Sequence, residues 1–406
     1  MVDMALSDVR VLDLTHHVAG PFATNRLAGF GADVIKIERP DGGDPARHIG
    51  PFLRSEAHRE KSKTFFYLNT NKRGITLNLK TPTGRNILKE LVKKADVVVE
   101  SFRPHVMRDL GLSYEELKSV NPRIVMASIT TFGQTGPYAE YKATEMVYYG
   151  MAGSMYQAGE EDREPVSFGV PTAVYYGGLT AATGILGAVF KAMDPEDPVG
   201  QYVDISLMEE YLTSVDRRIS SLLAYEYSGM DSQRESIRGG FATGYFPCQD
   251  GYFCMAASGN YMFPRMVKMM GDPEPLLDPR FMTPEGQRNP ELRDLFEAVL
   301  IGWAMEHSKE EISQLAAANG LICAPVNNMA DVSRDKHFNA RGVFVDVEHP
   351  VMGNVRTIGR PFVMKETPFQ MRRPAPLLGQ HNKEVYCDEL GYSAQDLVRL
   401  RQTGVI

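Results

Sequence analysis

A segment near the N-terminus, residues 12–44, has the residue types of an anion-binding turn. It reads LDLTHHVAGPFATNRLAGFGADVIKIERPDGGD, which predicts a strand, a tight turn, a helix, a second strand and a glycine-rich loop. Glycine turns and helix N-termini present backbone N–H groups to anions. The GxGxxG spacing of a dinucleotide-binding fingerprint is absent from this segment. The alternative is an ordinary βαβ unit without a ligand.

A positive cluster follows in residues 69–85, NTNKRGITLNLKTPTGR. It contains Lys72, Arg73, Lys80 and Arg85, within a chain that is acidic as a whole. Arginine binds phosphate through a bidentate fork, and lysine binds it as a point charge. The sequence therefore predicts a site for phosphate groups here, with a solvated turn as the alternative.

Two further segments place polar or turn residues after buried strands. In VVVESFRPHVMRDLGLSYEEL (97–117), Ser101 and Phe102 come where the strand ends. In ITTFGQTGPYAEYKATEM (129–146), a strand runs into a Gly/Pro turn. Ligands of parallel α/β sheets bind beyond the carboxyl ends of the strands. The expected ligand positions are Thr15–Gly20, Arg39 and Ser101–Arg103.

The elements that must position these residues alternate between strand and helix. The hydrophobic patterns predict strands at 9–15, 33–39, 74–80, 96–102 and 123–130, and helices at 21–31 and 83–95. Pro21 is expected to start the first helix, and Ile87, Leu88, Leu91 and Val92 share one face of the second. This order predicts an α/β fold with a parallel sheet of the Rossmann type.

The length of the chain predicts two domains. A chain of 406 residues is too long for one compact core. Residues 225–325 are expected to form a small α+β domain, with a hairpin turning at Asp250-Gly251 and a Met-rich helix at 262–271. That helix is either a core helix or the wall of an apolar acyl pocket. Residues 1–220 and 326–406 are expected to form the large Rossmann-like domain.

The composition argues against several classes of function. The net charge of −7 argues against nucleic acid as the main partner, because binding to phosphate backbones requires a basic field. The four cysteines are scattered without metal-ligand spacing, so neither a zinc site nor a disulfide framework is expected. The N-terminus lacks the pattern of a signal peptide, and a reduced, cytoplasmic setting is expected.

An uncharged run covers residues 166–190. It has no Asp, Glu, Lys, Arg or His, whereas its flanks, GEEDREP and KAMDPEDP, are charged. The run is long enough to span a bilayer, but its glycines, Pro171 and hydroxyl residues make it only weakly hydrophobic. We therefore expect a helix buried at a domain or subunit contact, where small residues permit close backbone approach, and no membrane partner.

Six motifs occur in one order along nearly the whole chain. They are VLDLTHHVAGPFATNRLAGFGADVIKIE, NTNKRGITLNLKTPTGR, ADVVVESFRPHVMRDLGL, ASITTFGQTGPY, GILGAVFKA and GQYVDISLME. Together they resemble the class III CoA-transferase family, the group of formyl-CoA transferase and carnitine CoA-transferase. The resemblance implies ring-like subunits that thread through one another in an intertwined dimer. It also implies that CoA binds to the large Rossmann-like domain of each subunit.

The resemblance implies that CoA, or an acyl-CoA, is the substrate and that no metal takes part. The matched CoA-contacting positions are His16, His17, Val18, Ala19, Arg39, Leu68, Asn71, Lys72, Arg73, Ser101, Phe102 and Lys142. For His16 the alternative is a hydrogen-bonded turn histidine. For Lys142 the alternative is a surface lysine.

The chemistry of the family depends on one Asp that this chain lacks. In the family that carboxylate attacks the donor thioester, passes through a mixed anhydride and is then loaded with CoA as a thioester. It lies ten residues before the Gly-Ile-Leu of a helix and four before a glycine. Counting back from Gly184 gives Val174, and Gly178 follows it in the same register. A valine has no nucleophilic atom, so no aspartyl intermediate and no catalytic residue are expected in this chain.

Other departures from the family agree with this expectation. Val18 stands where formyl-CoA transferase has an amide side chain, and Ser101 stands where Asn is common. No His lies between Tyr141 and Gly169, so the related acyl-CoA racemase chemistry also lacks its base. The carboxylates that would have to replace the Asp are Glu145, Glu160, Glu161, Asp162 and Glu164, for which a solvated acidic loop is the alternative.

The sequence therefore predicts a noncatalytic subunit of a heteromeric class III CoA-transferase. A homologous partner would carry the Asp, in a heterodimer or heterotetramer, and the turn at 257–263 would face the neighbouring chain's site. Within the family, succinyl-CoA:(R)-benzylsuccinate CoA-transferases are built from two different homologous subunits, and this chain is similar to the subunit without the Asp. Two alternatives stay open: a self-sufficient acyl-CoA enzyme that uses another residue, and a CoA-binding protein without catalysis.

Overall fold

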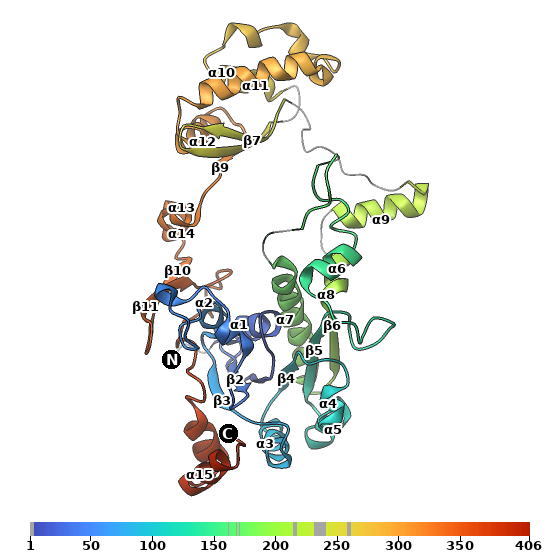
Figure 1. Ribbon diagram of the computed structural model, residues 1–406, viewed down its shortest axis with the longest axis vertical. Coiled ribbons are helices and arrows are strands. Elements are labelled where there is room, and N and C mark those ends of the chain that lie inside the picture. The colour runs from blue at the N-terminus through green and yellow to red at the C-terminus, as the bar shows by residue number, and fades with distance from the viewer. Residues whose placement is uncertain are drawn as a thin grey trace. The chain divides into compact units, whose positions relative to one another are not determined.

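The computed structural model describes residues 4–160, 162–167, 169, 171–213, 217–230, 241–257 and 261–406. The chain divides into two units, whose elements are labelled in Figure 1. The first unit holds Met1–Tyr156, Val166–Ser232 and Ala340–Ile406, and the second holds Gln157–Pro165 and Gln233–Asn339. The first unit is therefore built from both ends of the chain.

A six-stranded parallel sheet forms the centre of the first unit, in the order β3-β2-β1-β4-β5-β6. Its strands are β1 (Arg10–Asp13), β2 (Asp33–Glu38), β3 (Arg73–Thr76), β4 (Val97–Glu100), β5 (Val125–Thr130) and β6 (Tyr202–Ser206). The strand order reverses between β1 and β4, and ligands of open α/β sheets bind beyond the strand ends at such a point. The predicted α/β fold with a parallel sheet is confirmed.

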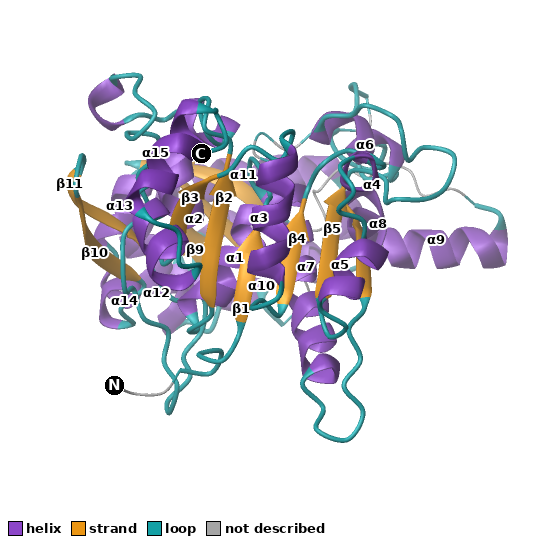
Figure 2. Ribbon diagram, turned by 90° about the horizontal axis from the view of Figure 1, so that it is seen from below, coloured by secondary structure: helices purple, strands orange, loops and turns teal. Residues whose placement is uncertain are grey.

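Helices cover both faces of this sheet (Figure 2). The helices of the first unit are α1 (Ala19–Gly29), α2 (Lys63–Asn69), α3 (Pro82–Val92), α4 (Val106–Asp109), α5 (Tyr114–Val120), α6 (Glu145–Met151), α7 (Thr172–Ala192), α8 (Leu207–Thr213), α9 (Arg217–Ser228) and α15 (Ala394–Gln402). On one face α1 and α7 share a buried cluster with Val97 and Val99. On the other face α3 and α5 share a cluster with Val98 and Met126. Successive residues of β4 thus point to opposite faces, as the period of a strand requires.

The first helix begins earlier than the sequence predicted. It starts at Ala19, so Pro21 lies within its first turn and not at its start. A proline is tolerated there because the first N–H groups of a helix have no partner within the helix.

Most of the uncharged run lies in α7 (Thr172–Ala192), a core helix of the first unit. By length and composition alone it could span a membrane. One of its sides is buried, including Ala173, Ala181 and Ile185. At Gly178 a β-carbon would lie 2.6 Å from the carbonyl oxygen of Ala19, so a side chain there would force α7 away from α1. The opposite side of α7 is exposed in this structure.

The C-terminal segment packs along the edge of the sheet at β3. Tyr386 is fully buried, and its hydroxyl donates to the carbonyl oxygen of Thr76 at 2.6 Å. Arg73 makes a two-point ion pair with Asp33, at 2.9 and 2.6 Å, and also contacts Glu389. These bonds fix the last part of the chain to its first part. A hairpin of β10 (Phe344–His349) and β11 (Gly353–Ile358) precedes this segment.

The second unit combines an antiparallel sheet with helices. Its elements are β7 (Ala242–Cys248), β8 (Gly251–Ala257), α10 (Phe263–Met269), α11 (Pro290–Ala304), α12 (Lys309–Ala318), β9 (Cys323–Pro325), α13 (Met329–Arg334) and α14 (Lys336–Ala340), where the chain returns to the first unit. Cys248 pairs with Gly251 across the predicted hairpin turn. Met266 and Met269 of α10 lie in the buried cluster, so the Met-rich segment is a core helix. Residues 258–260 of the predicted loop at 257–263 lie outside the described residues.

Replacing Tyr386 by Phe should lower the free energy of unfolding by about 1–2 kcal/mol, because the buried Thr76 carbonyl loses its hydroxyl donor. Urea denaturation followed by circular dichroism measures the loss. Tyr392→Phe is the matched control, since that hydroxyl bonds to Glu90 in a partly exposed setting, and it should cost less than about 0.5 kcal/mol. Equal losses in the two variants would contradict the role given to Tyr386.

Candidate functional site

A cavity of about 270 Å³ lies at the carboxyl ends of β1, β4 and β5. It is lined by the turns that follow these strands and by the starts of α7 and α8. The lining residues are His16, His17, Val18, Ala19, Gly20, Ser101, Phe102, Arg103, Pro104, Ile129, Thr130, Thr131, Ala139, Glu140, Tyr141, Val174 and Leu207. The structure thus brings together around one cavity the predicted positions His16, His17, Val18, Ala19, Ser101 and Phe102.

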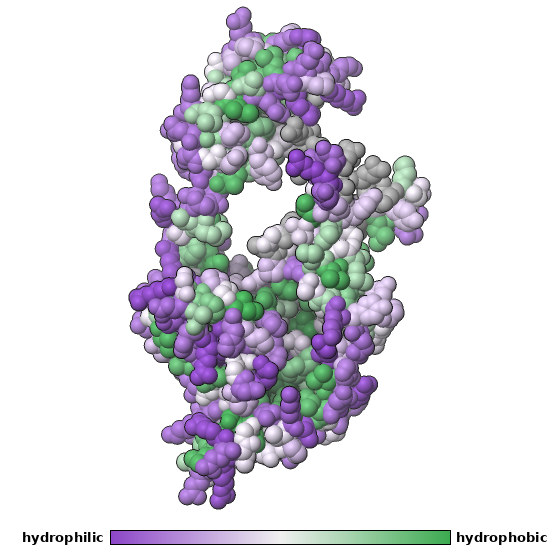
Figure 3. Space-filling model, viewed as in Figure 1, coloured by the Kyte–Doolittle hydropathy of each residue, from purple (hydrophilic) through white to green (hydrophobic). Residues whose placement is uncertain are grey.

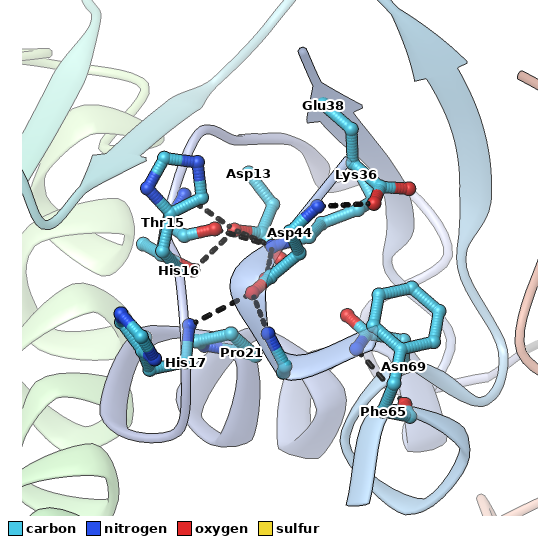
Figure 4. A network of polar contacts seen from close by, with 12 residues as sticks. Asp13, Thr15, His16, His17, Pro21, Lys36, Glu38, Asp44, Phe65 and Asn69 are labelled. Carbon is cyan, nitrogen blue, oxygen red and sulfur yellow. Dashed lines mark hydrogen bonds and ion pairs between the residues drawn. The ribbon is translucent and has the colours of Figure 1, made fainter. Parts of the chain in front are cut away.

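Two buried carboxylates fix the turn after β1 (Figure 4). Asp13 accepts hydrogen bonds from the backbone N–H of Thr15, at 3.0 Å, and from its hydroxyl, at 2.5 Å. Asp44 accepts one from the N–H of His17 at 3.0 Å. His17 has a φ of 62°, in the left-handed region that few non-glycine residues adopt. The Asp44 bond therefore holds a strained backbone whose side chains line the cavity.

Two buried ammonium groups balance these carboxylates. The Nζ of Lys36 lies 2.8 Å from Asp44 and donates to the carbonyl oxygen of Thr15. The Nζ of Lys72 lies 2.9 Å from Asp13. None of the four charged side chains has exposed surface. Because removing one partner from a buried ion pair leaves an uncompensated charge, each of the four depends on the others.

Burial and charge pairing oppose each other in setting the pKa values of this network. Burial would raise the pKa of Asp13 and Asp44. The adjacent charge of Lys36 nevertheless lowers both pKa values below their usual range, and at Asp13 the charge of Lys72 lowers the pKa further. Burial would lower the pKa of Lys36, but Asp13 and Asp44 raise it. At Lys72 burial prevails and lowers the pKa to about 8. All four groups are therefore charged at neutral pH.

His16 joins the turn after β1 to the turn after β4. Its backbone N–H donates to the hydroxyl oxygen of Ser101 at 2.9 Å. Its ring meets the ring of Phe102 edge to face, with centroids 5.5 Å apart. Burial, reinforced by the charge of Lys36, lowers the pKa of His16 to about 4, so the imidazole is neutral at pH 7. His16 is thus both a hydrogen-bonded turn residue and a wall of the cavity.

Val174 lines the same cavity from the first turn of α7. Gly178, one turn further along the helix, lies against the Ala19 carbonyl and so brings the start of α7 beside the turn after β1. The side chain at position 174 consequently faces the space that His16 and Ser101 also face. Its methyl groups pack against the adjoining apolar core and offer neither a nucleophile nor a hydrogen bond.

Two carboxylates lie close to Val174 in the structure. Glu140 lines the cavity, but it is largely exposed and lies 3.2 Å from the Nδ1 of His105. Glu145 accepts a hydrogen bond from the N–H of Ala173 at 2.8 Å, and burial raises its pKa. It lines a separate hollow of about 190 Å³ instead of the cavity. Of the other predicted carboxylates, Glu160, Asp162 and Glu164 belong to the second unit, and Glu161 lies outside the described residues.

The remaining predicted positions are not gathered at the cavity. Leu68, Asn71, Lys72 and Arg73 are buried, and the two cations among them pair with internal carboxylates. Lys72 and Arg73 therefore do not form the open phosphate site predicted at 69–85. Arg39 and Lys142 are exposed and do not line the cavity, and their contacts with CoA stay predictions.

Sequence reasoning missed the charged residues that hold the cavity walls in place. They are Asp13, Lys36, Asp44 and Glu100, each buried. A signal was present, since VLDLT, VIKIE and VVVE each carry a charge in or at the end of an apolar strand. A buried charge requires a partner, but the sequence does not say which residue supplies it.

The groups that face the cavity suit an organic ligand with polar and apolar parts. They include ring, hydroxyl and backbone groups from His16, Phe102, Ser101 and Thr130, with Arg103 able to meet an anion. Within the described part of the chain no group of three His, Cys, Asp or Glu side chains is arranged to hold a metal ion.

Replacing Lys72 by Met should lower the free energy of unfolding by about 3–5 kcal/mol, because the Asp13 carboxylate would stay buried with its close cation removed. Guanidinium denaturation measures this loss. Lys80→Met serves as the control, since Lys80 is exposed in the same segment, and should cost less than about 0.5 kcal/mol. A small loss for both variants would show that the network does not stabilise the fold.

Comparison with known proteins places this geometry in a family. The sequence pattern of CoA-transferase family III matches residues 6–382. A formyl-CoA:oxalate CoA-transferase of Streptomyces avermitilis is 35% identical over 419 residues, covering 99% of each protein. A succinyl-CoA–D-citramalate CoA-transferase of Chloroflexus aurantiacus is 33% identical, covering 99% of this chain and 98% of that protein. The crystal structure of a CAIB/BAIF family protein from Brucella suis has a TM-score of 0.84 at 29% identity, covering 95% of this chain and 99% of that one.

These likenesses extend over nearly the whole length of both partners in each comparison. They agree with the parallel sheet and with the cavity at its strand ends. The chain belongs to CoA-transferase family III.

Proposed function

We propose that this chain is the noncatalytic subunit of a heteromeric class III CoA-transferase. It would bind or enclose a CoA thioester while a homologous partner chain supplies the Asp nucleophile. The complex would move CoA from a donor such as succinyl-CoA to a carboxylic acid. Family membership supports the CoA-transferase chemistry, and several relatives are named for succinyl-CoA or formyl-CoA reactions.

The observation that carries the proposal is the apolar side chain at position 174. Covalent CoA transfer needs a group that is first a nucleophile and then a leaving group, as a carboxylate is. Val174 lies in the cavity where the family's Asp is expected, yet it has no such group. The surrounding turn is intact, with His16 bonded to Ser101. A cavity that is preserved but has no nucleophile at position 174 favours a role in binding or enclosing the CoA thioester.

The carboxylates near Val174 give little support to a self-sufficient enzyme. The Glu145 carboxylate is bonded to the N–H of Ala173, where it compensates the positive end of α7. It lines the neighbouring hollow, so an attack in the cavity would require it to leave that bond. Glu140 lies next to His105 at the surface, where water keeps a carboxylate weakly nucleophilic.

An uncovered face of α7 supports the presence of a partner chain. The exposed residues recur at helical spacing and carry no charge; they are Tyr176, Leu179, Thr180, Thr183, Leu186, Gly187 and Phe190. Phe190 is 84% exposed and Tyr176 is 55% exposed. Figure 3 shows apolar residues, in green, at the surface near α7 and α8. An uncharged stripe with small residues suits close packing of a second chain, and the intertwined family dimer offers a homologous one.

Restoring the carboxylate tests the role of position 174. Val174→Asp in the pure chain should exchange label between succinate and succinyl-CoA at least about tenfold faster than the unmutated chain. Val174→Asn is the matched control, because the side chain of asparagine has nearly the shape of aspartate but no nucleophilic carboxylate. This variant should stay inactive. Rapid exchange by the unmutated chain would contradict the proposal and favour a self-sufficient enzyme.

A charge on the exposed face of α7 tests the docking of the partner. Phe190→Glu should weaken the complex with the homologous chain at least about tenfold, because the partner would have to bury an unpaired carboxylate. Co-purification and analytical ultracentrifugation measure the effect. Val398→Glu, at a 55% exposed position on α15, is the control and should leave the complex intact. If Phe190→Glu binds the homologous chain as tightly as the unmutated protein does, the partner does not pack on the exposed face of α7.

A further inference from the structure

The end of β4 carries a buried carboxylate to which the proposed function assigns no role. Glu100 is 2% exposed, and its Oε2 accepts a hydrogen bond from the backbone N–H of Phe102 at 2.7 Å. A side chain bonded to the backbone two residues later sets the turn that follows it. Ser101 and Phe102 belong to this turn, and both line the candidate cavity.

The turn after β4 in turn holds the turn after β1. The Ser101 hydroxyl oxygen accepts the backbone N–H of His16 at 2.9 Å. The Phe102 ring lies against the His16 ring, with centroids 5.5 Å apart. One carboxylate therefore fixes two of the walls of the cavity.

We propose that Glu100 is a positioning residue for ligand binding: it holds the Ser101–Phe102 turn, and through it His16, in the shape that receives the ligand. The inference rests on the proposed function only in taking CoA as that ligand. Glu100 does not line the cavity, so it acts through the turn. An ionised carboxylate accepts a hydrogen bond more strongly than a neutral one, so the turn is firmest when Glu100 is ionised.

The carboxyl group of Glu100 faces a second hollow, of about 460 Å³. This hollow lies on the α3 and α5 face of the sheet, because Glu100 follows Val98 by two residues along the strand. The hollow gives protons a route to Glu100 that does not pass through the candidate cavity. The charged and titratable groups that line this hollow with Glu100 are Arg103, His105 and Arg108 before or in α4, Tyr114 and Glu115 in α5, and Tyr202 in β6. The charge of Asp204, also in β6, acts on Glu100.

The ionisation of Glu100 changes in the physiological range. Burial raises the pKa of Glu100 to about 7, and the Asp204 charge adds to the increase, whereas the hydrogen bond from the Phe102 N–H opposes it. As the pH falls through about 7, Glu100 gains a proton and its bond to the turn weakens. The affinity for CoA should therefore fall with the pH.

The test compares the full chain with Glu100→Gln, in which an amide of the same shape stays neutral at every pH. Isothermal titration calorimetry measures CoA binding at about pH 8 and about pH 6. At the higher pH Glu100→Gln should bind CoA about three- to tenfold more weakly than the unmutated chain, and at the lower pH the two should bind equally. Protonation of CoA and of the other titratable groups of the chain affects both proteins alike, so it cancels from the ratio of their affinities. Glu115→Gln, on the rim of the same hollow, should behave as the unmutated chain.

A second measurement does not depend on small differences in affinity. Calorimetry in two buffers with different ionisation enthalpies, at about pH 7, should show that CoA binding releases more protons from the unmutated chain than from Glu100→Gln, because binding favours ionised Glu100. If the unmutated chain and Glu100→Gln bind CoA with equal affinity at both pH values, or release equal numbers of protons, the role of Glu100 is overturned. The proposed function would still stand. An unmutated chain that binds no CoA at either pH overturns the CoA site itself.

Discussion

The candidate site depends on the buried ion pairs beneath the turn after β1. These pairs join four separate segments of the chain. Lys72 lies 2.9 Å from Asp13, and Lys36 lies 2.8 Å from Asp44, all without exposure to solvent. Such a network is weak evidence for net stability, but removing any one member would leave a buried charge without its partner. Asp13 and Asp44 also accept the backbone hydrogen bonds of Thr15 and His17, so the charges that hold the sheet ends together also shape the cavity wall.

Two further contacts position the remaining parts of the cavity wall. Glu100 fixes the turn after β4, and Gly178 lets α7 approach Ala19 so closely that position 174 faces the cavity. The turns after β1 and β4 and the start of α7 are therefore held by interactions that do not involve the side chain at position 174. On the proposed function, a valine could stand in place of a carboxylate at this position without disturbing these contacts.

The sequence predicted the elements with strong periodicity. The strands around Leu12, Ile35 and Val98 were found because runs of β-branched and apolar residues are bounded by turn residues. The hairpin at Asp250-Gly251 followed from its turn chemistry. The roles of Lys72 and Arg73 were not predictable. Whether a cation beside a turn is exposed or buried depends on carboxylates that lie far away in the sequence. Asp13 lies 59 residues from Lys72, and Glu389 lies 316 from Arg73. The position of Val174 in the cavity was predictable only through the resemblance to the family, since nothing in an apolar helix marks one valine.

The central claim is that this chain works with a homologous partner that carries the missing Asp. Native mass spectrometry of the protein isolated from its source cells tests this most directly. The account predicts a complex with a second chain of similar mass, whose sequence has Asp at the position of Val174. A homodimer of about twice 45.2 kDa with no second chain would contradict it.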